Sequence, residues 1–260
     1  MRIPILLAVS LWTLAAHAAA PMCRTSSAAL ARPLIELYTS EGCNSCPPAD
    51  RWLASGFDAA GESSPAVALA FHVDYWDRLG WVDRFADAAY TERQYRAMRA
   101  NGASFVYTPQ VLLQGHDFAG WRNGAAAIDA AARRPARAAV TLEARAAPSE
   151  VVAQVDALVA DAALARDAEV FVAYADSGLV SDVKAGENQG VRLAHDHVVR
   201  ALRTAGAVDA SGRVRATIAL PIPGEAGTHP TLVAFVQRAT TGDVLQTVAL
   251  PLDRCVNASP

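Results

Sequence analysis

The chain has 260 residues, which suits one large domain or two small ones, and its 52% hydrophobic and 19% charged residues are typical of a globular protein. Its 23 basic and 26 acidic residues give a formal net charge of -3, so it offers no strongly basic surface to nucleic acid or to an anionic membrane. We therefore expect no nucleic-acid partner and no stable membrane insertion, and the oligomeric state stays open.

The first 20 residues predict a signal peptide. Arg2 precedes the apolar run IPILLAVSLWTLAA, which is short for a membrane span, and the small-residue sequence AHA follows at residues 16–18. An uncleaved anchor helix is the alternative. Cleavage near Ala18 would release a periplasmic or secreted protein into a compartment where disulfides form and persist.

The four cysteines allow three pairings in such a compartment. Cys43 and Cys46 are close neighbours, whereas Cys23 and Cys255 lie near opposite ends of the mature chain. Because chain termini often lie close together at a domain surface, we expect a structural disulfide between Cys23 and Cys255. The alternative leaves both of these thiols free.

The residues around Cys43 and Cys46 predict a strand, a turn and a helix, in that order. The run PLIELYTS has the composition of a buried strand, Gly42 permits a sharp turn, and PPADRWLASGF begins a helix beside Cys46. Free N–H groups and the helix dipole would favour the thiolate of Cys43. Structural zinc needs four ligands, and no second ligand pair with zinc spacing accompanies these cysteines, so we expect no metal.

The run AVALAFHVD, residues 66–74, predicts a second buried strand that forms a β-α-β unit with the first. Chemistry gathers beyond the carboxyl ends of such strands, so His72 and Cys43 should be neighbours. His72 is therefore a candidate for proton transfer. A strand histidine satisfied by a local hydrogen bond is the alternative.

The segment from residue 91 to 134 predicts a helix, a hairpin and a second helix. Thr91 and Gln94 form a T-x-x-Q capping signal, Pro109 directly precedes the apolar strand QVLL, and an Ala-rich helix closes the segment. A cis peptide before Pro109 would orient its backbone groups in a direction that a trans peptide does not allow. Thr108 and Pro109 are therefore candidates for presenting backbone to a substrate. An ordinary trans proline in a turn is the alternative.

Beyond residues 134–138 the sequence changes to short β-rich runs separated by turn residues, which predicts an all-β, sandwich-like second domain. Its segment GENQGVRLAHDHVVRAL supplies a candidate second-domain site, made of Glu187, Asn188, His195 and Arg200. His195 and His197 are two residues apart, a poor arrangement for joint metal ligation. A structural loop docked over the cysteine face is the alternative.

The order strand, C-x-x-C, helix, strand, helix, Thr-Pro, hairpin, helix resembles the thioredoxin and glutaredoxin superfamily over residues 33–134. More closely, the segments ELYTSEGCNSCPPAD, HVDYWDRLGW, TPQ and GENQGVRLAHDHVVR resemble an exported bacterial family of unassigned activity, the domain of unknown function 1223. The resemblance implies an α/β fold class, with a thioredoxin-like N-terminal domain at residues 21–136 and a β-rich C-terminal domain at 137–260. It also makes Glu36, which lies about where thioredoxins keep a buried acid, a second candidate for proton transfer.

These features predict an exported thiol–disulfide oxidoreductase that needs no cofactor and acts on exported thiol or disulfide proteins. Cys43 would exchange with the substrate disulfide, and Cys46 would resolve the mixed disulfide. One alternative is a protein that binds a soft ion such as Cu(I) through Cys43, Cys46 and His72. The other is a non-catalytic interaction module whose cysteine pair is permanently oxidised.

Overall fold

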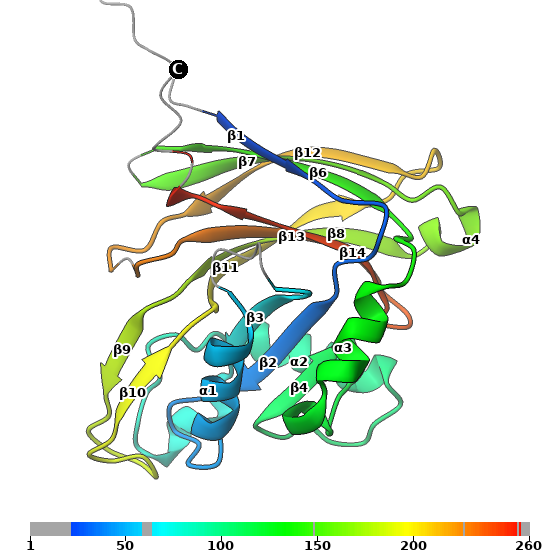
Figure 1. Cartoon of the computed structure of the whole chain (residues 1–260). Helices are drawn as coiled ribbons and strands as arrows, with labels where there is room; N and C mark the ends of the chain where they lie inside the picture. Colours follow the sequence, from blue (N-terminus) through cyan, green and yellow to red (C-terminus); the bar gives the residue numbers. More distant parts are fainter. Residues whose placement is uncertain (1–21, 59–63, 148, 226, 254, 256–260) are drawn as a thin grey trace, which may run out of the picture.

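The computed structural model describes residues 22–58, 64–147, 149–225, 227–253 and 255. The predicted signal peptide at residues 1–20 lies outside this part of the chain. Strands account for 41% of the protein and helices for 20%. The fold is therefore mainly β, and Figure 1 shows its strands stacked in layers with most of the helices gathered at one end.

The elements follow one another in this order: β1 (Met22–Ser26), β2 (Leu34–Thr39), α1 (Pro47–Gly56), β3 (Val67–His72), the 3-10 helix η1 (Asp74–Leu79), α2 (Ala88–Ala100), β4 (Gln110–Leu113), β5 (His116–Asp117), η2 (Trp121–Asn123), α3 (Ala125–Ala132), β6 (Ala139–Ala146), β7 (Glu150–Leu158), α4 (Ala162–Ala165), β8 (Ala168–Asp176), β9 (Leu179–Asp182), β10 (Arg192–His195), β11 (Val198–Ala207), β12 (Arg213–Pro221), β13 (Thr231–Arg238) and β14 (Val244–Pro251).

One eight-stranded sheet runs through the molecule in the order β14-β13-β8-β11-β3-β2-β4-β5. Strands β2 and β3 are parallel, with Leu34 opposite Val67 and Thr39 opposite His72, and α1 is the crossover between them. Every residue of these two strands is buried, which explains their continuous apolar runs. Their carboxyl ends therefore lie side by side.

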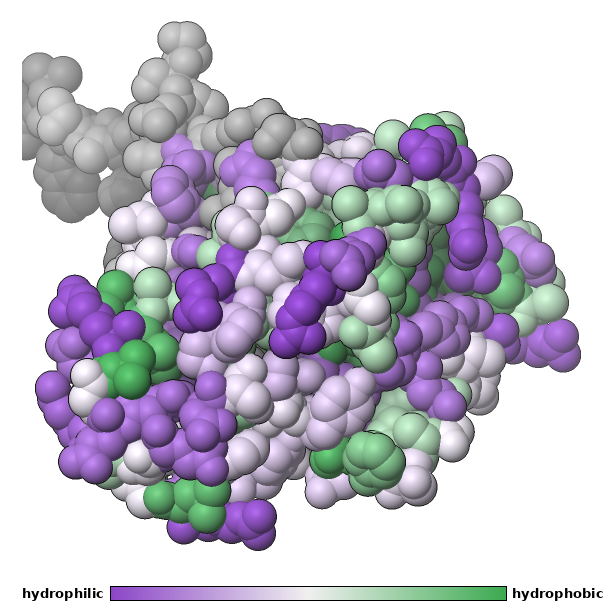
Figure 2. All heavy atoms as spheres, turned by 60° about the horizontal axis from the view of Figure 1, so that its bottom comes forward, coloured by the Kyte–Doolittle hydropathy of each residue, from purple (hydrophilic) through white to green (hydrophobic). Residues whose placement is uncertain are grey.

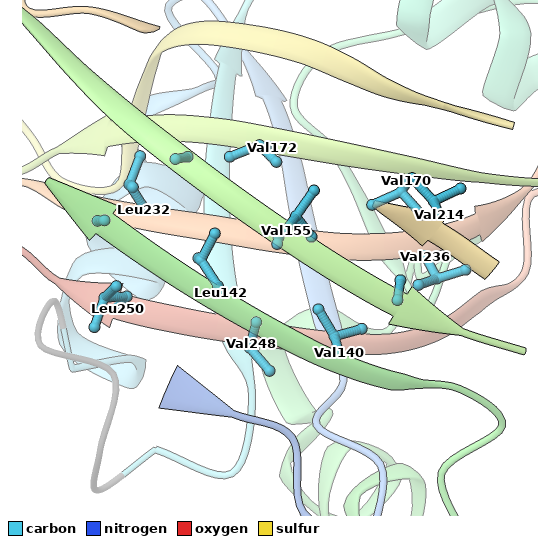
Figure 3. Close-up of a cluster of buried hydrophobic side chains, with 14 of the residues drawn as sticks. Val140, Leu142, Val155, Val170, Val172, Val214, Leu232, Val236, Val248 and Leu250 are labelled. Atoms are coloured by element: carbon cyan, nitrogen blue, oxygen red, sulfur yellow. The ribbon is translucent and has the colours of Figure 1, made fainter. Parts of the chain in front are cut away.

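A second sheet, in the order β1-β6-β7-β12, packs on the half of the large sheet formed by β8, β13 and β14. The alternating burial along β7 shows that one of its faces is turned inward. Figure 3 shows the side chains between the two layers, which are mainly Val and Leu, among them Val155, Val172, Leu232 and Val248. Each such side chain stabilises the fold by roughly 1.5–3 kcal/mol through burial.

The helices cover the other half of the large sheet from both sides (Figure 1). Leu53 of α1 and Ile128 of α3 pack with Ile35 and Leu37 of β2. Tyr90 of α2 packs on the opposite face, with Tyr38 of β2. Strand β2 thus separates an α1 face from an α2 face, and alternate β2 side chains belong to each.

The predicted fold class, an α/β thioredoxin-like N-terminal domain followed by an all-β sandwich-like domain, is wrong. Strands from the second half of the chain enter the same sheet as β2, β3 and β4, and β11 lies directly beside β3. The N-terminal strand β1 also pairs with β6, in the other sheet. Local patterns identify single strands but do not say which distant strand completes the edge of a sheet.

The predicted helix start at Thr91 is also wrong. Helix α2 begins at Ala88, and Asp87 caps it by accepting a hydrogen bond from the Ala89 amide at 2.8 Å. The Thr91 hydroxyl instead donates to Asp74 Oδ1 at 2.6 Å. It thereby ties α2 to η1.

Cys23 of β1 is bonded to Cys255, and their Cα atoms are 5.2 Å apart. The bridge closes a loop of 232 residues, and restricting the unfolded chain over such a length is worth roughly 4–5 kcal/mol in the chain-entropy model. In the described part of the chain, the helices are too short or too polar to cross a bilayer.

The β4–β5 hairpin turns through two residues with positive φ, Gln114 at 55° and Gly115 at 84°. A Cβ atom on Gly115 would lie 1.9 Å from the Gly242 carbonyl oxygen, so Gly115→Ala should lower the free energy of unfolding by more than about 2 kcal/mol. Gly102, with φ at 64° and open space around it, is the matched control, and Gly102→Ala should cost only about 1 kcal/mol. Denaturant unfolding of both oxidised variants measures the difference; equal losses would show that backbone conformation alone decides the cost.

Candidate functional site

The Cys43–Cys46 pair lies beyond the carboxyl ends of β2 and β3, at the start of α1. The Val73 amide donates to the Thr39 carbonyl at 2.9 Å, which holds the segment after β3 against the segment after β2. Cys46 is the N-cap residue of α1, and Pro47 and Pro48 form the first helical positions. The two cysteines are disulfide-bonded, with Cα atoms 5.4 Å apart.

Two hydroxyl groups flank the sulfur of Cys43. The Thr108 hydroxyl donates to Cys43 Sγ at 3.3 Å, and Ser45 Oγ lies at the same distance. Trp76 Nε1 donates in turn to Thr108 Oγ1 at 2.8 Å, and the Thr108-Pro109 peptide is cis. The chain from Trp76 through Thr108 to Cys43 thus points a polarised O–H group at the sulfur.

The backbone around the bridge uses its N–H groups elsewhere. The amides of Cys43 and Cys46 donate to backbone carbonyls, and those of Ala49 and Asp50 both donate to the Cys46 carbonyl. Pro47 has no N–H, and neither does the proline that follows it. The groups that contact the Cys43 sulfur are therefore hydroxyls, and not the free backbone N–H groups expected from the sequence.

The segment 186–190 from the second half of the chain is docked on the cysteine loop. The Asn188 amide Nδ2 donates to the carbonyl oxygens of Glu41 and Cys43, at 2.8 and 3.0 Å. Glu187 accepts from the Asn44 amide at 3.1 Å. Asn188 and both cysteines are buried, so this segment forms part of the packing around the bridge.

Beneath the cysteine loop lies a buried cluster of Glu41, His72, Asp83 and His195, which we call the acid–histidine cluster. His72 Nδ1 is 2.6 Å from Asp83 Oδ2, and His195 Nε2 is 3.3 Å from Glu41 Oε1. The two imidazole rings meet edge to face, with centroids 5.1 Å apart. Glu41 is only two residues from Cys43, so the cluster borders the bridge.

Charge and burial set the protonation of this cluster. Burial alone would lower the pKa of His72, but the neighbouring carboxylates of Asp83, Asp50 and Glu41 outweigh it and raise the pKa above 6.5. Burial works to raise the pKa of Asp83, but its close contact with His72 lowers that pKa instead. Burial raises the pKa of Asp50, which lies in the first turn of α1.

Several polar atoms in the cluster have no hydrogen-bond partner within the described residues. They are Nε2 of His72, Nδ1 of His195, and the facing atoms His195 Nε2 and Glu41 Oε1, which lie 3.3 Å apart without forming a hydrogen bond. Among the residues that the structure describes, no group of three or more His, Cys, Asp or Glu side chains is arranged to hold a metal ion.

Two candidate residues lie away from the bridge. Glu36 is on the α2 face of β2, where its carboxylate accepts from Arg93 Nε at 2.7 Å and from the Tyr38 hydroxyl at 3.2 Å. Arg200 lies on β11, with its guanidinium 5.1 Å from the centre of the Phe85 ring. The structure thus gathers Cys43, Cys46, Thr108, Pro109, His72, Glu187, Asn188 and His195 around one site, and places Glu36 and Arg200 outside it.

Sequence reasoning missed Glu41, Asp83 and Trp81. Trp81 Nε1 donates to Glu41 Oε2 at 2.7 Å, and Asp83 accepts from the Glu41 amide at 2.8 Å. The position of Glu41 directly before Gly42 and Cys43 is a usable signal, because a carboxylate so close to a thiol affects its titration. Asp83 carries no local signal, since only the fold brings it beneath the cysteine loop.

Figure 2 turns the lower end of Figure 1 toward the reader and shows a mostly polar surface with small, separate apolar patches. The exposed apolar side chains on segments that border the bridge are Leu79, Val82, Phe105 and Val191. Isolated exposed apolar side chains of this kind are normal on a protein surface.

Fold and site together define a mainly β protein with two disulfides, one of which lies over a buried acid–histidine cluster. The chain belongs to the family described as protein of unknown function (DUF1223), whose profile matches residues 34–237. This match confirms the family resemblance seen in the sequence. Comparison with curated proteins gives no match.

Two solved structures share the fold. A structural-genomics crystal structure of a protein from Agrobacterium tumefaciens is 29% identical, with a TM-score of 0.61, and the match covers 90% of this chain and 98% of that one. HBP35 of Porphyromonas gingivalis is 14% identical, with a TM-score of 0.63, and the match covers 87% of this chain and 77% of that one. At this identity, the second likeness shows the fold alone.

The pKa values of two buried histidines, His72 and His197, should be shifted in opposite directions. Asp83 raises the pKa of His72 above 6.5, whereas burial lowers the pKa of His197 below 6.5. In Asp83→Asn the burial of His72 remains but its closest carboxylate is gone, so its pKa should fall while that of His197 stays unchanged. Imidazole resonances followed by NMR across the pH range measure both in one sample.

The ion pair between His72 and Asp83 predicts that the stability of the protein depends on pH. Because the folded pKa of His72 is raised, its contribution is complete below pH 6.5 and is lost as the pH rises through the folded pKa. Because the folded pKa of Asp83 is lowered, its contribution is present above its unfolded pKa of about 3.9 and is lost as the pH falls through the folded pKa. In Asp83→Asn the free energy of unfolding should depend less on pH in both the acid and the neutral range. An unchanged pH dependence would contradict the ion pair.

Proposed function

We propose that the protein is an exported thiol–disulfide oxidoreductase whose reactive couple is Cys43–Cys46. The observation that carries the proposal is the Thr108 hydroxyl, which donates to Cys43 Sγ at 3.3 Å and is itself held by Trp76. A donor aimed at one sulfur of a bridge stabilises the thiolate that forms there on reduction, and the thiolate is the reactive species. A purely structural bridge has no need of such a donor.

The exchange transfers two electrons and needs no cofactor. Reduced Cys43 attacks a substrate disulfide, forming a bond to one substrate sulfur while the other leaves as a thiolate and takes a proton. Cys46 then attacks the sulfur of Cys43, forms the intramolecular bond and releases the second substrate thiolate. In the reverse direction, a substrate thiolate attacks the oxidised bridge at Cys43, and Cys46 leaves as the thiolate and is protonated.

Access to Cys43 requires a local movement, because both sulfur-bearing residues are fully buried in the oxidised form. We place this movement in the exposed residues Asn44 and Ser45, together with the docked segment 186–190. The contacts that hold this segment are few hydrogen bonds from Asn188 and Glu187. Breaking them frees the cysteine loop and leaves the strand pairing of the eight-stranded and four-stranded sheets intact.

The expected location and substrates follow from the chemistry. The leader-like residues 1–20 and the two disulfides support a periplasmic or secreted protein, since such bonds persist in oxidising compartments. The partners are exported proteins that carry thiols or disulfides. Leu79, Val82 and Phe105 offer apolar contacts to the chain of such a substrate.

The proposal predicts unequal serine variants. In Cys46→Ser the mixed disulfide on Cys43 has no resolving thiol, so covalent adducts with exported proteins should accumulate. Cys43→Ser should trap few or none. Non-reducing gels of affinity-purified protein, with and without reductant, reveal the adducts.

A matched control separates the reactivity of this couple from the loss of a disulfide in general. The double variant Cys23→Ser/Cys255→Ser removes the other bridge and leaves the couple intact, so it should trap no more than wild type. Absence of adducts in Cys46→Ser, or equal trapping by Cys43→Ser, would reduce the pair to a structural disulfide.

The hydroxyl of Thr108 should control the acidity of Cys43. Thr108→Val keeps the shape of the side chain but removes a hydrogen bond to a charged sulfur, worth roughly 1.5–3 kcal/mol, so the Cys43 pKa should rise by roughly one to two units. Thr141→Val, which removes a hydroxyl bonded to Ser26 on the distant sheet, should leave the Cys43 pKa unchanged. Thiolate absorbance of the reduced protein against pH gives both values, and identical curves would remove Thr108 from the mechanism.

A further inference from the structure

A large cavity lies on the α2 face of the eight-stranded sheet, on the far side of β2 from the cysteine bridge. Its volume is about 550 Å³, within the range of sites that hold small organic molecules. Helix α2 forms one wall, strands β2, β8, β11 and β13 supply most of the others, and Pro221 of β12 also lines the cavity. The second sheet packs on the opposite face of these strands, so the cavity occupies the part of the sheet that α2 leaves uncovered.

The inner part of the cavity is aromatic and electrically neutralised. Tyr38, Tyr90 and Phe171 line it, and Phe171 is stacked on Phe235 with ring centroids 5.3 Å apart. The buried guanidinium of Arg93 lies 5.4 Å from the centre of the Phe171 ring. Its Nε is 2.7 Å from Glu36 Oε2, so the two buried charges cancel and the floor accepts an apolar ring.

The cavity is also lined by Arg96, Arg200 and Arg203, which form no ion pair among the described residues, and by the carboxylates of Asp87 and Glu169. Arg96 on α2 and Arg203 on β11 are exposed. Arg200 is half-buried, with its guanidinium over the Phe85 ring and its Nη1 donating to the Glu225 carbonyl at 3.2 Å. Within the described part of the chain, no carboxylate lies within 4.0 Å of these three guanidinium groups, whereas Arg238, also on the wall, is paired with Asp167 at 2.7 Å. Unpaired arginines beside an apolar floor match a ligand whose one end is anionic.

We propose that this cavity binds a small amphipathic anion, an aromatic carboxylate or sulfonate, with its ring over Phe171 and its charged group among Arg96, Arg200 and Arg203. The site is separate from the cysteine couple and does not depend on its activity. The aromatic floor supplies affinity through burial, and the arginines supply the preference for an acid over its neutral analogue.

Two fluorescent probes that differ only in charge test the proposal on the oxidised, full-length mature protein. The probe 8-anilinonaphthalene-1-sulfonate should bind at one site per chain, and its uncharged parent, N-phenyl-1-naphthylamine, should bind at least tenfold more weakly. Arg96→Gln/Arg203→Gln should weaken the sulfonate about tenfold and leave the neutral probe unchanged. Phe171→Ala should weaken both.

The control is Arg145→Gln, which removes an exposed arginine from β6 in the other sheet and should change neither affinity. Arg96 and Arg203 are exposed, so the double variant should keep the thermal unfolding midpoint of wild type. Binding to Phe171→Ala is measured only at temperatures well below the unfolding midpoint of that variant. Equal affinity for the two probes, binding at several sites per chain, or full sulfonate affinity in the double variant would overturn the proposal.

Discussion

The pairing of β11 with β3 is the contact on which the rest of the architecture depends. The two strands are parallel and are joined at one residue pair, Val198 opposite Ala70. The Ala70 amide also donates to the His197 carbonyl at 2.8 Å. This junction makes one sheet from strands that are far apart in the chain. It also fixes the residues just before β11, so that His195 and Asn188 reach the loop that carries Cys43. The cysteine site therefore exists only when both halves of the chain are assembled.

Helix α2 is shared between the two sites. On one side, Gln94 donates to the Tyr107 carbonyl and to Gln110, on either side of the Thr108-Pro109 peptide, and Thr91 bonds to Asp74. On the other side, Arg93 forms the ion pair with Glu36 at the floor of the cavity. Helix α2 therefore supports both the wall of the cysteine site and the wall of the cavity.

The sequence was informative wherever the signal was local. The strand before Cys43, the helix after it, the second strand ending at His72 and the family membership all rest on short patterns, and the structure and the family match contain each of them. The fold class could not be obtained in this way, because it depends on β11 joining β3 and β1 joining β6. Glu36 shows the same limit: its place on β2 was visible, but its partner Arg93 on α2 was not. Asp83 shows it for the site, since nothing near it in sequence points to His72.

The two disulfides close loops of very different length, with partners separated by 3 positions in one and 232 in the other. In the proposed export, a chain translocated from its N-terminus would bring Cys23, Cys43 and Cys46 into an oxidising compartment ahead of Cys255. A bond from Cys23 to either nearby cysteine closes a far shorter loop than the native bond and forms at a lower entropic cost. Such a bond would keep β1 away from β6. Productive maturation therefore depends on early closure of the Cys43–Cys46 pair, which protects Cys23 until its partner arrives, or on an isomerase that corrects the first bond formed.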